Sequence, residues 1–323
     1  ANINPVQSRR LIDRYHLRPD KVFTIGTALD PQFFRECTAS DKREHRRRMA
    51  HVLGGDPALE PMSVERFRRH LGVWMADQHP IVCAAHDDLL LDITSPESLY
   101  ILQPTRVVPR KRIWRDWELI GALLEHEPFR EAFEQDPRLT LTLHVTGPVP
   151  IEHRDAIERI LDSYRAVLAA VPTSIGRRLF QAFSVGFQSH PSLDQPIDIV
   201  DIYQLADLVL FPSLTEGRGL PIPESAAAGV PLVCSEYEPR AVFEEVIGMD
   251  LDPQHSILYD EFPLGDFSAD LLAAVTSMLL DPSSTTDRIL HNREAVRHRY
   301  SIDTLTASFD EILAGLERAM RGV

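Results

Sequence analysis

The sequence of 323 residues has few of the features that mark specialised classes of protein. No stretch contains the roughly 20 consecutive apolar residues that a helix needs to span a bilayer. The first residues, ANINPVQSRR, contain neither the apolar core of a signal peptide nor an initiating Met, so we expect the chain to begin within a longer protein. We find no internal repeat and no low-complexity tract, which argues against a repeat architecture.

Cysteine is also scarce. The three cysteines, Cys37, Cys83 and Cys234, share no spacing typical of a metal site. An odd number of cysteines in an acidic chain of globular composition indicates a reducing compartment, and we expect a cytoplasmic location. Cys234 lies in the apolar run VPLVCS and is expected to be a buried core thiol.

Positive charge is in deficit, because the net charge is −14 and the isoelectric point is near 5.4. This balance argues against nonspecific binding of nucleic acid, which depends on cationic contacts to phosphates. The basic runs gather in the first third of the chain, at residues 41–48, 66–70 and 106–115. For the first two runs, the simpler interpretation is a set of solvated helix faces. The alternative is a surface over residues 41–70 that docks a partner or an anionic membrane.

What is present is an alternation of short apolar runs and amphipathic segments from about residue 98 onward. The expected strands are residues 99–103, 139–147, 180–187, 208–212 and 230–235. Between them, residues 157–171 repeat an apolar residue every three or four positions, which predicts one buried face of a helix. This alternation predicts an α/β fold, with a Rossmann-like parallel sheet covered by helices on both faces.

The segment before residue 98 follows a different pattern. Residues 6–17 and 63–79 read as amphipathic helices, and residues 21–25 as the one clear strand, so this part is not expected to form a full sheet. The tail, residues 292–320, is expected to be helical with a break at Ser301.

Three loops follow predicted strands and open onto predicted helices, at residues 104–112, 146–150 and 213–224. In open parallel sheets, ligands bind beyond the carboxyl ends of the strands, where such loops lie. The expected ligand site is therefore formed by these three loops.

The last of these loops, SLTEGRGLPIPE, has the composition of a helix start that binds an anion. Pro221 and Pro223 suit the first turn of a helix, and Gly229 suits its end. Gly217 and Gly219 allow a ligand to approach the backbone closely. The N–H groups at such a helix end favour an anion, most often a phosphate.

Charged residues flank this predicted phosphate site. Glu216 and Glu224 cannot be phosphate ligands, and we interpret them as acceptors for sugar hydroxyls on either side of a phosphate. Arg106 and Lys111, in the loop after the first predicted strand, could neutralise a diphosphate; from spacing alone they are equally well surface charges.

These residues resemble a known family. The segment ADLVLFPSLTEGRGLPIPESAAAGVPLVCSEYEP is similar to the nucleotide-sugar site of the family-4 retaining glycosyltransferases of the GT-B fold, also described as glycosyl transferases group 1. Glu216 and Glu224 match its E-x7-E motif, and Arg106 and Lys111 match its Arg-x4-Lys diphosphate clamp. HVTGPVP resembles its third ligand loop at Gly147, and VFTIGTALDPQFF its interdomain linker. The resemblance runs from about residue 15 to the end, interrupted by about residues 36–95.

The resemblance implies a reaction. A retaining glycosyltransferase would move a hexose from a UDP-, GDP- or ADP-linked donor to a hydroxyl of a sugar or other acceptor. It would need no metal and no cofactor, because cationic side chains stabilise the leaving diphosphate. The motif DLD at residues 250–252 mimics the acidic motif of metal-dependent transferases, but its position after a helix argues against a metal role.

The resemblance also implies roles for single residues. Glu216, Arg106 and Lys111 would be catalytic, with Glu216 on the donor sugar and the two cations on the diphosphate. Glu224 would hold the ribose. The donor would also contact residues that line the loops: Gly147, Gly217, Arg218, Gly219 and Leu220.

The same resemblance divides the chain. Residues 1–35 would be a remnant of an N-terminal domain and the interdomain linker, and residues 36–95 a mainly helical insertion. Residues 96–283 would be the Rossmann-like donor domain, and residues 284–323 the C-terminal helices. The acceptor-binding N-terminal domain of the family is missing, so we expect it to have been removed or to be supplied by a partner chain.

The sequence departs from the family at two points and leaves other functions open. Arg218 stands where the family often has an aromatic residue, and Thr27 and Ala28 replace the Asn-Gly of the linker. His144 lies in the middle of a strand and is interpreted as structural. The alternatives are a sugar-nucleotide epimerase or hydrolase of the same fold, and a non-catalytic module that binds nucleotide sugars.

Overall fold

The structure, a computed structural model, describes residues 4–55, 58–185 and 196–321. Within these residues, one eight-stranded sheet runs in the order β1-β2-β5-β4-β3-β6-β7-β8. Six strands are mutually parallel: β3 (Ser98–Gln103), β4 (Thr140–Val145), β5 (Leu179–Phe183), β6 (Leu208–Phe211), β7 (Leu232–Cys234) and β8 (Asp260–Glu261). The remaining pair, β1 (Met62–Ser63) and β2 (Ile81–Ala84), extends one edge, with β2 antiparallel to β5.

The order of the six parallel strands creates a switch point. Numbered along the chain from β3, they lie in the order 3-2-1-4-5-6, which is that of a Rossmann sheet. The chain runs outward from β3 in one direction and returns to the other side of β3 as β6, where Ile101 pairs with Leu208. The crevice between the loops that follow β3 and β6 is where this architecture binds ligands.

Helices cover both faces of the sheet, because successive strand side chains alternate between two buried clusters. In β3, Tyr100 and Leu102 join one cluster, and Leu99 and Ile101 join the other. The first cluster is covered by α2 (Ala39–Val52), α8 (Ile199–Gln204), α9 (Pro221–Ala228), α10 (Arg240–Ile247) and α12 (Thr286–Tyr300). The second is covered by α3 (Val64–Asp77), α4 (Trp114–Glu125), α5 (Glu127–Gln135), α6 (Arg154–Ala170), α7 (Thr173–Gly176) and α11 (Ala269–Leu280).

The expectations for the larger part of the chain are confirmed. All five expected strands form, as β3 to β7, although residues 186–187 of the third lie outside the described residues. The helix expected at residues 157–171 is α6, and α3 buries the apolar face expected of residues 63–79. Cys234 is fully buried. The break at Ser301 separates α12 from α13 (Ile302–Arg321).

The expectation for strands before residue 98 is wrong. Residues 21–25 form no strand, whereas β1 and β2 lie within residues 36–95, a segment expected to be mainly helical. All four residues of β2 are buried. The run IVCA therefore lacks the alternation of apolar and polar residues that would distinguish a strand from a turn of buried helix. Its pairing with β5 depends on a partner about a hundred residues further along the chain, as in Val82 opposite Ala182.

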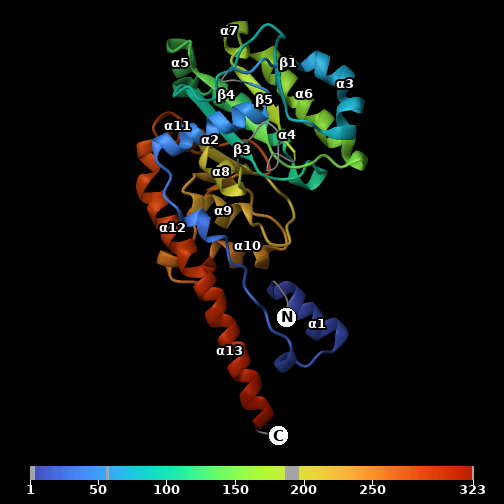
Figure 1. Cartoon of the computed structure of the whole chain (residues 1–323), viewed down its shortest axis with the longest axis vertical. Helices are drawn as coiled ribbons and strands as arrows, with labels where there is room; N and C mark the ends of the chain where they lie inside the picture. The colour runs from blue at the N-terminus through green and yellow to red at the C-terminus, as the bar shows by residue number, and fades with distance from the viewer. Residues whose placement is uncertain (1–3, 56–57, 186–195, 322–323) are drawn as a thin grey trace.

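The two ends of the chain lie at the same end of the molecule (Figure 1). Helix α1 (Pro5–Tyr15) packs beside α10, and α13 extends away from the sheet as a single long helix. Among the described residues, no helix combines the length and the apolar character required to cross a bilayer.

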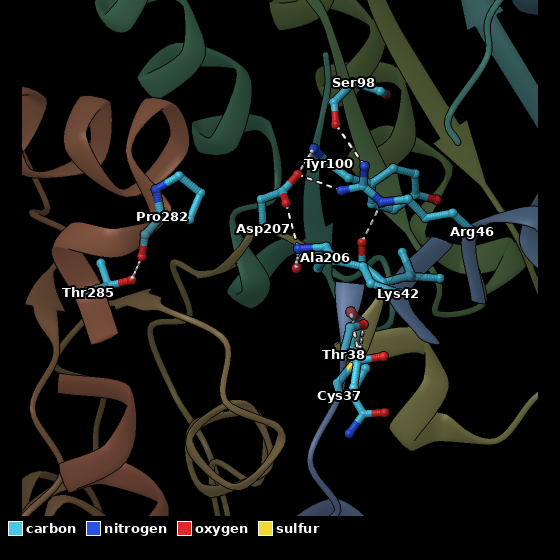
Figure 2. Close-up of polar contacts among 12 residues, drawn as sticks. Cys37, Thr38, Lys42, Arg46, Ser98, Tyr100, Ala206, Asp207, Pro282 and Thr285 are labelled. Atoms are coloured by element: carbon cyan, nitrogen blue, oxygen red, sulfur yellow. Dashed lines mark hydrogen bonds and ion pairs between the residues drawn. The ribbon is translucent and has the colours of Figure 1, made fainter. Parts of the chain in front are cut away.

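The basic run at residues 41–48 is not simply a solvated helix face. It forms part of α2, and Arg46 is only 5% exposed (Figure 2). The Arg46 guanidinium donates to the Ser98 carbonyl at 2.9 Å and to Asp207 Oδ2 at 2.6 Å. Lys42 Nζ donates to the other Asp207 oxygen at 2.6 Å. The run therefore fastens α2 to the start of β3 and to the residue before β6.

Asp207 is the centre of this anchor. It also accepts the backbone N–H of Tyr100 at 2.7 Å, so the carboxylate bridges α2 and β3. Burial alone would raise the pKa of Asp207, but the charges of Arg46 and Lys42 and the hydrogen bonds outweigh it, and the pKa is lowered. A lowered pKa means that the ionised carboxylate stabilises the folded state at neutral pH.

We predict that Arg46→Met lowers the free energy of unfolding by about 3 kcal/mol, because it leaves Asp207 buried with its charge poorly compensated. Arg47→Met on the same helix, whose side chain is 52% exposed, is the control and should cost less than about 1 kcal/mol. The difference between the wild type and Arg46→Met should shrink as the pH falls through the pKa of Asp207, which lies below the ordinary value of an aspartate. Urea unfolding measures both effects, and equal losses in the two variants would contradict the anchor.

Candidate functional site

The loops after β3 and β6 meet directly. The first contains Arg106 and the short helix η3 (Pro109–Lys111), and the second leads through residues 212–220 into α9. The backbone N–H of Leu214 donates to the Arg110 carbonyl at 2.8 Å, which joins the two loops next to the switch point. Two of the three loops expected to form the ligand site are therefore in contact.

Lys111 and Glu216 form an ion pair between these loops. Lys111 Nζ donates to Glu216 Oε1, and each side chain is only 9% exposed. The Ser213 hydroxyl donates to the same oxygen, and an Arg110 nitrogen lies 3.3 Å from Glu216 Oε2. Burial lowers the pKa of Lys111, against the opposing effect of Glu216. The ammonium also lies 4.9 Å from the centre of the Phe211 ring.

The turn after Glu216 presents a row of backbone donors. None of the N–H groups of residues 217–220 donates a hydrogen bond to another residue that the structure describes. Gly219 has φ +65°, and a Cβ there would lie 2.2 Å from the Tyr237 hydroxyl, so the turn requires glycine. Leu220 then caps α9, whose first residue is Pro221, as the sequence predicts. These donors at a helix start suit an anionic ligand.

Glu224 lies in the first turn of α9 and faces α8. Its Oε2 accepts a hydrogen bond from the Tyr203 hydroxyl at 2.7 Å. Burial raises the pKa of Glu224, and the Tyr203 hydrogen bond opposes this rise. Glu216 and Glu224 therefore lie at the two ends of the turn with different partners, one a cation and the other a phenol.

The third expected loop, after β4, packs against the loop after β3. A Cβ on Gly147 would lie 2.2 Å from the Thr105 carbonyl oxygen and 2.4 Å from the Arg106 nitrogen, so only glycine fits there. The Val107 N–H donates to the Pro148 carbonyl at 3.0 Å. The Arg106 side chain is exposed, and it makes no hydrogen bond or ion pair with another described residue.

Residues near the N-terminus hold the turn from a third side. The Asn4 side chain donates to the Gly217 carbonyl at 3.0 Å. The Arg218 guanidinium donates to the Thr27 hydroxyl at 2.7 Å and lies 3.7 Å from Glu245. Arg218 therefore connects the turn to the linker segment, at one of the two linker positions where the sequence departs from the family pattern.

A cleft of about 360 Å³ lies at this junction, and it is lined by Arg110, Thr215, Glu216, Gly217, Glu238 and Pro239. A larger groove of about 580 Å³ lies between α4 and α6 and contains none of the expected site residues. Volume alone therefore does not mark the site; the charged groups and the free backbone donors do.

Other candidates from the sequence have structural partners. Asp252 caps a short turn by accepting the Gln254 N–H at 3.2 Å. Across the described ranges, no three His, Cys, Asp or Glu side chains are grouped so that they could hold a metal ion. His144 is buried between the Tyr100 and Ser184 hydroxyls, each 2.7 Å away, and burial lowers its pKa to about 3.

The sequence analysis missed three residues that shape the site. Arg110 and Ser213 contact Glu216, and Tyr203 contacts Glu224. Arg110 and Ser213 lie within the loops already singled out, so their proximity to Lys111 and Glu216 along the chain was an available signal. Tyr203 lies in a helix 21 residues before Glu224, and no local pattern connects the two.

Comparisons with known proteins point to one family. A sequence model of the family described as Glycosyl transferases group 1 matches residues 155–281. No curated protein matches the sequence. The structure is similar to that of HepE from Anabaena in complex with UDP and glucose, with 14% identity and a TM-score of 0.53, over 97% of this chain and 62% of HepE.

Two further solved structures show the same likeness. A glycosyltransferase from Rickettsia africae has 11% identity and a TM-score of 0.53, over 97% of this chain and 62% of that protein. WaaG, a glycosyltransferase involved in lipopolysaccharide biosynthesis, has 14% identity and a TM-score of 0.51, over 96% of this chain and 60% of WaaG. The chain thus spans less than two thirds of the length of these proteins.

The family match covers β5, β6, β7 and the whole turn between Glu216 and Glu224, and the likeness of fold extends over almost the entire chain. The sequence of residues 155–281 is thus similar to the glycosyl transferases group 1 family, and the α/β fold of the chain is similar to that of solved glycosyltransferases.

Proposed function

We propose that this chain forms the donor site of a retaining, metal-independent glycosyltransferase, which moves a hexose from a nucleotide diphosphate sugar to an acceptor hydroxyl. One observation carries the proposal. At the switch point of the sheet, the unpaired N–H groups of residues 217–220 lie between Glu216 and Glu224 and beside Lys111. The structures of HepE in complex with UDP and glucose and with UDP-glucose support a nucleotide sugar as the donor.

In this proposal the diphosphate binds at the turn before α9. Gly217, Arg218, Gly219 and Leu220 supply backbone N–H groups, and Gly147 lets the neighbouring loop approach. Of the four cations at residues 104–112, only Arg106 has no partner among the described residues. Lys111 and Arg110 contact Glu216, and Arg112 donates to the Leu264 carbonyl. Arg106 is therefore the side chain most available to the diphosphate, and Lys111 supplies a second charge from its position beside Glu216.

The carboxylates would bind the two sugars of the donor. Glu224 accepts hydrogen bonds from the ribose hydroxyls, and Glu216 accepts them from the hexose. The cations and the helix N-terminus stabilise the charge of the leaving diphosphate. We therefore propose that the reaction needs no metal. We also propose that the acceptor attacks on the face that the diphosphate leaves, which keeps the anomeric configuration.

The binding site for the acceptor is proposed to include residues that do not belong to this chain. The structure spans 62% of HepE, so we propose that a further domain or a partner chain completes the acceptor site. Transfer assays across an acceptor panel separate this proposal from an epimerase or hydrolase, whose products form with no acceptor other than water. Binding of a donor without any transfer would favour a non-catalytic module.

We predict that one of UDP, GDP and ADP raises the thermal unfolding midpoint, and that Glu224→Ala lowers the affinity for that nucleotide by roughly 10- to 100-fold. The loss follows from removing hydrogen bonds between a carboxylate and the ribose hydroxyls. The free energy of unfolding should fall by about 1–3 kcal/mol, because the buried Tyr203 hydroxyl loses its acceptor. Glu244→Ala on α10, a half-exposed carboxylate paired with Arg240, is the control. Unchanged affinity for every nucleoside diphosphate would contradict the ribose assignment.

We predict that Arg106→Met lowers the affinity for the same nucleoside diphosphate by roughly 10- to 100-fold and leaves the affinity for the corresponding nucleoside unchanged, because only the diphosphate contacts the guanidinium. Combined with Lys111→Met, it should slow transfer by about 10²- to 10⁴-fold. Titration calorimetry with both ligands measures the binding effects, and the exposed Arg69→Met is the control. An equal loss for the nucleoside and the diphosphate would rule out a phosphate contact.

We predict that Gly147→Ala weakens diphosphate binding by about tenfold or more, because the new Cβ must displace the Thr105–Arg106 backbone. Nucleoside binding should change little. Gly265→Ala, where a Cβ would meet nothing within 4 Å, is the matched control. Wild-type diphosphate affinity in Gly147→Ala would show that this loop does not position Arg106.

A further inference from the structure

The Tyr203 hydroxyl is placed to act on Glu224. It donates to Glu224 Oε2 at 2.7 Å from α8, and the Tyr203 side chain is completely buried. Burial raises the pKa of Tyr203 well above its usual value, so the phenol keeps its proton and acts as the donor. No other hydrogen bond to Glu224 side-chain oxygens is found among the described residues, which leaves Oε1 available.

The position of Tyr203 is fixed from two sides. Its ring makes an edge contact with Phe33, with ring centres 5.8 Å apart. Two residues later, the Leu205 carbonyl accepts a hydrogen bond from Arg46 at 2.9 Å, so the α2 anchor also holds the end of α8. The phenol therefore reaches Glu224 from a rigid support rather than from a loop.

We propose that Tyr203 is a positioning residue: its hydroxyl holds one oxygen of Glu224, which directs the other oxygen toward the ribose hydroxyls of the donor. This inference rests on the proposed function, because it assumes that Glu224 binds the ribose. It adds a residue outside the loops of the site, and it assigns to α8 a role in donor binding.

The groups around Glu224 predict how its protonation would change if the Tyr203 hydroxyl were removed. Burial raises the pKa of Glu224, and the Tyr203 hydrogen bond is the one influence that lowers it. Charged side chains on the elements packed against α9 have other partners. On α12, Arg293 donates to the Phe34 carbonyl at 2.8 Å, and on α8, Asp201 pairs with Arg48 at 3.0 Å. On α10, Glu245 lies near Arg218. Loss of the phenol would therefore let Glu224 take up a proton at higher pH.

The test is the pH dependence of nucleoside diphosphate affinity in the wild type and in Tyr203→Phe, which keeps the ring and removes only the hydroxyl. UDP, GDP and ADP are the probes. We expect the affinity at neutral pH to fall by about tenfold, and the midpoint at which acid weakens binding to move to higher pH. A 2′,3′-dideoxynucleoside diphosphate of the same base should bind both proteins equally, because it lacks the hydroxyls that Glu224 accepts.

Two controls separate positioning from a general structural effect. Tyr164→Phe removes another fully buried hydroxyl, which donates to the Leu179 carbonyl at 2.6 Å in the other core cluster. It should cost similar stability in unfolding experiments, but it should not move the pH midpoint of nucleotide binding. In a Glu224→Gln variant, adding Tyr203→Phe should not change the pH dependence of nucleoside diphosphate affinity, because the side chain at position 224 no longer titrates.

Failure of the proposed function and failure of the positioning role of Tyr203 would give different results. If the wild type binds none of the three nucleoside diphosphates, the proposed function fails, and the inference fails with it. If Glu224→Gln weakens binding while Tyr203→Phe leaves affinity and pH profile unchanged, the proposed function stands and the positioning role is overturned. An equal loss for the ribose and dideoxyribose ligands in Tyr203→Phe would likewise overturn it.

Discussion

The parallel pairing of β3 with β6 is the constraint on which the candidate site depends. The two strands are separated by more than a hundred residues of chain, yet Ile101 lies opposite Leu208 and Leu102 opposite Val209. This register brings the loop with Arg106 and Lys111 beside the turn that follows Glu216. The Lys111–Glu216 ion pair and the hydrogen bond from Leu214 to Arg110 then hold the two loops together. Without this register, the cations and the carboxylates would face different parts of the surface.

Helix α2, within the segment that the sequence predicts to be an insertion, supports this arrangement from the opposite end of the strands. Asp207, the residue just before β6, is held by Lys42 and Arg46 of α2, and it also accepts the N–H of Tyr100 at the start of β3 (Figure 2). The same helix bonds to the Leu205 carbonyl after α8. A segment that interrupts the resemblance to the family thus stabilises the strands that carry the loops of the candidate site. This role explains why Arg46 is buried in an acidic chain.

The site combines charge with strict local geometry. Backbone donors in the turn at residues 217–220 need a glycine at Gly219, because Tyr237 fills the space that a side chain would take. Gly147 has the same role between two loops, where a Cβ would overlap the backbone at Thr105. These glycines let backbone and ligand approach closely, while Glu216 and Glu224 keep their separate partners at either end of the turn.

Much of the candidate site could be predicted from the sequence, because its signals are local. Apolar runs marked β3 to β7, Pro221 and Gly229 marked the bounds of α9, and the glycines with Glu216 and Glu224 marked a ligand turn. Residues close in sequence share a turn or a strand whatever the remainder of the chain does. Local patterns failed for β2, whose four buried residues show no alternation, and for the strand expected at residues 21–25.

The sequence by itself determined the class of fold, the loops that carry the candidate site and the chemistry of the side chains in them. Only the tertiary structure decided which groups touch: Lys111 with Glu216, Tyr203 with Glu224, Arg218 with Thr27, and Arg46 with Asp207. Each of these contacts joins elements that are distant in sequence, and sheet order and register bring them together. The energy of a buried ion pair or hydrogen bond depends on that placement, which no local pattern of residues contains.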